Sequence, residues 1–142
     1  MTGAVIALTV KNPILAVPLA FLSHFVQDLI PHYGSKNTKL FGRGFNTYLI
    51  ADFLFSLCLM ALLGFWFPSH TWIIWGCMIA AASPDLMWAY YKLYIGHIKM
   101  REIKLGSVAA FHQSIQWKQT PPGAIVEAVW FVSMGAILIS LR

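Results

Sequence analysis

Long runs of apolar residues, separated by short polar stretches, extend through the whole chain. An α-helix needs about 20 apolar residues to cross the roughly 30 Å hydrocarbon layer of a bilayer. Three of the runs reach that length: residues 47–67, 72–91 and 122–141. The pattern therefore predicts three membrane-spanning helices beyond the first third of the chain.

The amino-terminal third contains a fourth apolar run, residues 13–30, which is interrupted by Pro13 and Pro18. Proline is tolerated in a spanning helix when its surroundings satisfy the backbone groups that it frees. Residues 1–10, ahead of this run, are apolar but too few to cross a bilayer. We therefore expect a short half-helix followed by a fourth span.

The composition indicates the same class of protein. Of the 142 residues, 58% are hydrophobic and 11% are charged, whereas ordinary soluble domains have about 25% charged residues. The chain contains no internal repeat, no low-complexity tract and no linker long enough to separate two domains. We predict a single all-α domain over residues 1–142, a polytopic membrane helix bundle with four spans.

Basic residues are concentrated in two of the three connections between the expected spans. The first connection carries three and no acid, and the third carries five and one glutamate: Lys36, Lys39 and Arg43, then Lys92, Lys99, Arg101, Lys104 and Lys118 with Glu102. In a four-span bundle these connections share one side, which the positive-inside rule places in the cytoplasm. We expect a multi-pass protein of the cell inner (plasma) membrane. Anionic lipid headgroups account for the net charge of +5, so no nucleic-acid partner is expected.

The third connection, residues 92–121, mixes apolar residues with Lys and Arg at partly helical spacing. Such a segment is typical of an amphipathic helix that lies in the membrane interface. Gly96 and Gly106 weaken a helix, so a loop folded over the mouth of the bundle is the alternative.

The acidic residues of the expected spans fall at similar depths. Counting ~1.5 Å per residue from the predicted cytoplasmic edge places them roughly 5 to 10 Å below one membrane face: Asp28, Asp52, Asp85 and Glu127. A charged side chain near the centre of a bilayer costs at least ~2.5 kcal/mol, so several of them require mutual or metal compensation. The layer therefore predicts one shared polar site.

Four residues of this layer have the chemistry of metal ligands. His24 and Asp28 are four residues apart and share one helix face, and His112 lies in the third connection on the same side. Asp85 follows Pro84, which we expect to break the third span locally and turn the carboxylate inward. Imidazole and carboxylate groups suit a divalent metal, zinc first, with iron or manganese as alternatives. Asp52 or Glu127 is the candidate general base, whichever reaches the metal-activated water.

Each residue taken alone also has a simpler interpretation. His24 can hydrogen-bond another helix, and the acids can each cap a helix or pair with a nearby cation. The candidate pairs are Asp28 with Lys36 or Lys39, Asp52 with Arg43, and Glu127 with Lys118. The remaining histidines are interpreted as interfacial or surface residues: His32, His70 and His97.

Three short segments carry a resemblance to a known family. They are S-H-F-V-Q-D-L-I-P-H at residues 23–32, S-P-D at residues 83–85 and F-H-Q-S at residues 111–114. Together they resemble the small inner-membrane proteins described as membrane-bound metal-dependent hydrolases, which carry an S-H-x-x-x-D helix motif, a P-D element and a His-Ser segment. In that family the His-Ser segment precedes the S-H-x-x-x-D helix, whereas here it follows and lacks a second histidine. The resemblance implies a multi-pass fold, a divalent metal and a hydrolase activity.

Three functions remain open. The first is a metal-dependent hydrolase that acts at the cytoplasmic leaflet on a lipid-like or lipid-linked ester or phosphoester. The second is a transport protein that relays protons or metal ions through the same groups. The third is a non-enzymatic subunit of a larger membrane complex. Membrane lipids are the expected partners in each case, and a homo-oligomer is compatible with all three.

Overall fold

The computed structural model describes residues 1–33, 43–91, 93, 106–115 and 120–142, without the side chains of residues 43 and 45. Within these ranges the chain is helical and contains no β-strand, which confirms the all-α prediction. The elements, in chain order, are α1 (Thr2–Val10), α2 (Pro13–Leu29), α3 (Arg43–Trp66), the 3-10 turn η1 (Pro68–His70), α4 (Thr71–Tyr90), α5 (Ser107–Ile115) and α6 (Gly123–Ser140).

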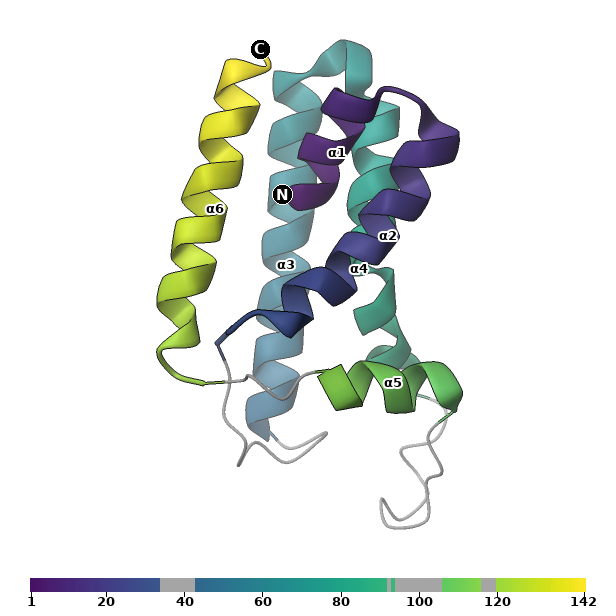
Figure 1. Cartoon of the computed structure of the whole chain (residues 1–142), viewed down its shortest axis with the longest axis vertical. Coiled ribbons are helices and arrows are strands. Elements are labelled where there is room, and N and C mark those ends of the chain that lie inside the picture. The colour runs from purple at the N-terminus through teal and green to yellow at the C-terminus, as the bar shows by residue number, and fades with distance from the viewer. Residues whose placement is uncertain (34–42, 92, 94–105, 116–119) are drawn as a thin grey trace.

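Three of the helices, α3, α4 and α6, are long and apolar enough to cross a membrane. Their bounds agree with the three predicted spans to within a few residues. The expected fourth span corresponds to α2, a shorter apolar helix of 17 residues that runs obliquely across the bundle (Figure 1). These helices fit the predicted four-span bundle.

The predicted half-helix at the amino end is α1, which packs against α2 and α4 (Figure 1). It ends at Lys11, whose φ of 58° is left-handed. Asn12 then starts α2, because its side-chain oxygen accepts a hydrogen bond from the backbone N–H of Ile14 at 3.0 Å. The close approach of α1 to α4 requires Gly3, since a Cβ there would lie 2.6 Å from the carbonyl oxygen of Cys77.

The prediction that Pro84 breaks the third span was wrong, because α4 continues through Pro84 to Tyr90. Proline has no N–H, so the carbonyl oxygen of Ala80, four residues earlier, loses its usual helical partner. The hydroxyl of Ser83 donates a hydrogen bond to that oxygen at 2.8 Å. The neighbouring serine thus replaces the missing donor and the helix remains continuous.

The hydrophobic core lies in the half of the bundle that contains α1 (Figure 1). It includes fully buried or nearly fully buried residues of α1, α2, α3, α4 and α6: Ala4, Ala7, Ala16, Ala20, Leu63, Ile74, Cys77 and Leu138. In the other half, α3 has no buried residue among those described between Gly44 and Cys58. One half of the bundle is therefore tightly packed, and in the half nearer to α5, which we call the open half, the described residues of α3 are not buried although Trp88, Ala109 and His112 are.

α5 lies across the open end of the bundle (Figure 1). It buries Ala109, His112 and Ile115 on one side and exposes Val108 and Phe111 on the other. This confirms the predicted amphipathic helix for residues 107–115, whereas residues 94–105 and 116–119 of the same connection lie outside the described residues. The backbone N–H of Gly106 donates to the hydroxyl of Tyr91 at 2.8 Å, which fixes the start of α5 to the end of α4.

Candidate metal centre

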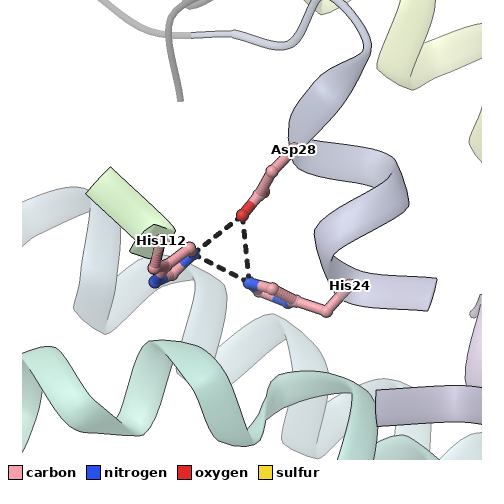
Figure 2. A group of neighbouring side chains, drawn as sticks. All are labelled: His24, Asp28 and His112. Atoms are coloured by element: carbon pink, nitrogen blue, oxygen red, sulfur yellow. Dashed lines mark hydrogen bonds and ion pairs between the residues drawn. The ribbon is translucent and has the colours of Figure 1, made fainter. Parts of the chain in front are cut away.

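His24, Asp28 and His112 meet in the open half of the bundle, although 84 residues separate Asp28 from His112 in the sequence (Figure 2). The Nε2 atoms of the two imidazoles are 3.1 Å apart. Asp28 Oδ2 lies 2.7 Å from His112 Nε2 and 3.3 Å from His24 Nε2. Three potential ligand atoms from two helices therefore face a common point.

Asp85 lies at the edge of this cluster. Its Oδ1 atom is 3.7 Å from His24 Nε2 and 3.8 Å from His112 Nε2. Its side chain is 43% exposed, whereas that of Asp28 is 14% exposed. The structure thus brings all four predicted metal-ligand candidates together, and Asp85 occupies the accessible side.

The separations suit a small divalent cation. Zinc binds imidazole nitrogen and carboxylate oxygen at about 2.0 to 2.2 Å, so neighbouring ligand atoms of a tetrahedral site are roughly 3.3 to 3.5 Å apart. The five separations given above lie between 2.7 and 3.8 Å, on both sides of that spacing. Asp28 Oδ2 is also buried, so it lies inside the cluster and not at its surface. Two imidazoles and two carboxylates fit zinc, iron or manganese.

The rings of both histidines are fixed by contacts behind the cluster. The imidazole of His24 meets the ring of the neighbouring Phe25 edge-on, with ring centroids 5.6 Å apart. The ring of His112 is fully buried and stacks on Trp88, with ring centroids 5.8 Å apart and an interplanar angle of 29°. Phe25 meets the His112 ring edge-on at 5.9 Å. Such support around metal-ligating histidines orients the ring and strengthens binding.

The two candidate general bases have different surroundings. The Glu127 carboxylate accepts a hydrogen bond from the backbone N–H of Tyr33 at 3.0 Å, so it holds the segment that follows α2. Asp52 is exposed in the open half and experiences electrostatic repulsion from both Asp85 and Glu127. Asp52 is therefore the base candidate whose carboxylate is not used to fix the backbone.

Within the described part of the chain, no lysine or arginine forms an ion pair with these acids; the ion pairs found there join His24 and His112 to Asp28 and Asp85. The cations of the simpler interpretations, Lys36, Lys39, Lys118 and the side chain of Arg43, lie outside the described residues, as does His97. His70 is exposed beside Ser69, as expected for a surface histidine. The ring Nδ1 of His32 lies 3.0 Å from the carbonyl oxygen of Ile30.

The supporting roles of Trp88 and Tyr33 were not indicated by the sequence. Trp88 belongs to an apolar run that was interpreted only as a membrane span, and Tyr33 belongs to the basic connection that follows the first apolar run. Trp88 is three residues after Asp85, and this spacing on one helix face is the signal that could have linked it to the site. For Tyr33 the contact uses a backbone N–H, which no residue type reveals.

No protein-family model, curated protein or solved structure matches the chain. The resemblance to membrane-bound metal-dependent hydrolases stays a prediction that rests on the motifs.

Proposed function

We propose that the protein is a membrane-bound metal-dependent hydrolase that acts at the cytoplasmic leaflet of the inner membrane on a lipid-like or lipid-linked ester or phosphoester. The observation that carries this proposal is the convergence of His24, Asp28 and His112, with Asp85 alongside, on a single point. Buried imidazoles and carboxylates in a membrane protein are costly unless they compensate one another or bind an ion. The basic connections support the cytoplasmic orientation.

His24, Asp28 and His112 would hold the metal, and Asp85 would bind or release it at the accessible side. A bound zinc ion, the first candidate, supplies Lewis acidity and lowers the pKa of water toward neutrality. Hydrolysis joins the oxygen of a water molecule to the carbonyl carbon or phosphorus, breaks the bond to the alcohol oxygen and leaves one proton. Asp52 accepts that proton, and the leaving alcohol takes up a proton in its turn.

The distribution of polar groups favours a one-sided site over a transport path. A conducting pathway needs polar side chains that continue to the opposite face of the membrane. Above the cluster, the described interior contains a short polar chain, in which Trp130 donates to Thr2 and Thr2 donates to Gln27, and beyond it the apolar residues of the core: Leu63, Ile74, Cys77 and Leu138. The same groups are therefore better suited to a reaction at one leaflet than to a relay.

Elemental analysis of the detergent-purified protein tests the metal centre. We expect close to one divalent metal ion per chain, because His24, Asp28 and His112 form a single cluster of candidate ligands. The His24→Ala variant should lose the metal, whereas His70→Ala, which changes an exposed histidine in η1, should retain it. Wild-type protein without stoichiometric metal, or His24→Ala protein that keeps it, contradicts the proposal.

Turnover tests the hydrolase. Metal-loaded protein in mixed micelles should hydrolyse at least one of a set of chromogenic acyl esters and alkyl phosphodiesters. Asp52→Asn should keep the metal and lower kcat by about 10²- to 10⁴-fold, the usual contribution of a general base. Metal-loaded protein that hydrolyses none of these substrates would remove the enzymatic part of the proposal and favour the accessory-subunit alternative.

A further inference from the structure

One face of α3 points toward the other helices but is covered over only part of its length. Its residues recur at intervals of four and three and therefore form one helical row: Tyr48, Asp52, Phe55, Leu59 and Leu63. Tyr48 contacts the ring of Tyr33, and Phe55 contacts Phe131 of α6, so the row faces inward. Tyr48 and Phe55 are nevertheless 50% and 51% exposed, Leu59 is half-buried, and Leu63 is 2% exposed.

The exposure of the side chains on α6 falls along the helix in the same way. The corresponding row begins in the open half of the bundle and ends in the core: Glu127, Phe131, Met134 and Leu138. Glu127 is exposed, Phe131 is 40% exposed, Met134 is half-buried and Leu138 is 2% exposed. Two helices that packed fully on each other would bury their facing rows along the whole length.

The two rows face each other and define what we call the α3–α6 seam. Phe55 and Phe131 meet across it with ring centroids 5.7 Å apart. Leu63 and Leu138 close its apolar end, because both belong to the hydrophobic core. Asp52 and Glu127 mark its polar end, 11 residues before these leucines on their helices, or about 16 Å along each helix. Between the two ends the facing side chains are apolar.

The polar end of the seam adjoins the metal centre. Asp52 is near enough to Asp85 for electrostatic repulsion, and Asp85 forms the accessible edge of the cluster. Within the described residues, the charged side chains at this end are acidic: Asp52, Asp85 and Glu127. Asp52 and Glu127 lie outside the metal cluster, and a phosphate beside them would meet their negative charges, so an uncharged polar group is favoured at this position.

We propose that the seam binds the hydrocarbon chain of the substrate and that the substrate is a single-chain acyl ester with an uncharged alcohol part. This inference rests on the proposed hydrolase function for its reaction, and it adds the substrate class and the residues that hold the chain. The ester lies at the level of Asp52 and Asp85, and the chain extends along Phe55, Leu59, Phe131 and Met134 toward the core. Hydrolysis adds one water across the acyl C–O bond and yields a fatty acid and an alcohol. Hydrocarbon is the occupant that suits this position, because the walls are apolar and lie within spanning helices.

Photolabelling tests the position of the chain. The probe is monolauroylglycerol with a diazirine at the end of its acyl chain, and the labelled residues are identified by peptide mass spectrometry. Labels should fall on α3 and α6 near Leu63 and Leu138 and should be suppressed by excess unlabelled monolauroylglycerol. Competition should increase from octanoyl to lauroyl esters and not increase further for longer chains, because the core closes the seam. A label spread evenly over the exposed faces of the spans would overturn the proposal.

Two leucines of α3 provide a matched pair of variants. Leu59 lies in the inward row, whereas Leu57 is on the opposite face of the helix and is 45% exposed. Leu59→Trp overfills the seam and should lower specific labelling about tenfold, whereas Leu57→Trp should leave it unchanged. Met134→Trp, which fills the seam from α6, should repeat the effect if Leu59→Trp destabilises the protein. Equal labelling of the Leu57 and Leu59 variants contradicts the proposal.

Further comparisons separate the alternatives. Dodecyl phosphate with the same diazirine should label the seam more weakly, and equal or stronger labelling would reject the uncharged head group. If a second copy of the chain covers the seam, the probe will not label it and Leu59→Trp will change the native mass from dimer to monomer, which also overturns the proposal.

Metal-free His24→Ala protein should still bind the probe. Labelling without hydrolysis therefore rejects the enzyme but keeps the seam, whereas hydrolysis without labelling rejects the seam.

Discussion

The imidazole of His112 is completely buried although it comes from a short helix that crosses the end of the bundle (Figure 1). Trp88 of α4 covers its face, Phe25 of α2 meets its edge, and Asp28 lies 2.7 Å from its Nε2 atom. Two helices of the bundle, α2 and α4, thus fix the plane of one ring. A ring held in this way presents its nitrogen to the cluster at little further cost in side-chain entropy.

Replacement of Trp88 should weaken metal binding without removing a ligand. In Trp88→Leu the His112 ring loses the surface on which it stacks, and the metal affinity should fall about 10- to 100-fold, as for other residues that orient ligands. Competition with a fluorescent chelator measures this change. Trp72→Leu is the control, because Trp72 is 83% exposed at the start of the same helix. Equal affinities for the two variants would show that the stacked ring is not important for metal binding.

At the scale of residues, the part of the site that depends on local geometry could be predicted. His24 and Asp28 share a face because they are four residues apart, which is fixed by the helix itself. The structural role of Glu127, which holds the segment after α2, could not be predicted, because its partner is the backbone N–H of Tyr33, 94 residues away. Backbone groups carry no sequence signature, so the sequence favoured a catalytic or ion-pair role for this carboxylate.

Ser83 and Pro84 form a unit within α4. The proline removes a donor from the helix, and the preceding hydroxyl supplies one to the same carbonyl oxygen of Ala80. This local exchange of donors keeps α4 continuous, and it places Asp85 on the helix face that meets α2 and α5.

Removal of the Ser83 hydroxyl should therefore destabilise the protein by about 1 kcal/mol, the net value of a typical hydrogen bond. In the Pro84→Ala background the same substitution should cost much less, because the backbone N–H that alanine restores at this position can then donate to the carbonyl oxygen of Ala80. Unfolding of the four proteins in mixed micelles gives the coupling between the two positions. Ser133→Ala is a matched control, since the oxygen to which Ser133 donates, that of Val129, keeps its helical partner. Absence of coupling would show that the serine does not replace the missing donor.

The limits of prediction at the scale of elements follow from the same example. Length and hydropathy determine where a spanning helix occurs, so α3, α4 and α6 were predicted to within a few residues. A proline in such a helix signals a break, but the outcome depends on whether a neighbouring side chain reaches one particular carbonyl. Sequence alone does not show that geometry.

The whole molecule is divided into a packed half and an open half. Apolar side chains fill the first, and the acids and imidazoles lie in the second. The clustering of the acids could be predicted, since isolated charges in a membrane are unfavourable. The α3–α6 seam could not, because every residue of its two rows is also compatible with ordinary helix packing.

Metal binding should couple α5 to the rest of the bundle. His112 is the candidate ligand that α5 contributes to the cluster, so a bound ion would link α5 to α2 through His24 and Asp28. Chelation should therefore speed amide hydrogen exchange in residues 107–115, while exchange in the core part of α4 stays unchanged. In His112→Ala protein, exchange in α5 should be fast with or without metal. Protection of α5 that does not depend on metal would contradict the coupling.

The position of His112 also bears on how the protein is made. Residues 24, 28 and 85 reach their places when their helices insert into the bilayer, and α5 is synthesised after all of them. Docking of α5 is then the step that brings the last candidate ligand into the cluster. Incorporation of the ion would therefore follow the synthesis of α5, and a nascent chain that stalls before residue 112 would not retain metal.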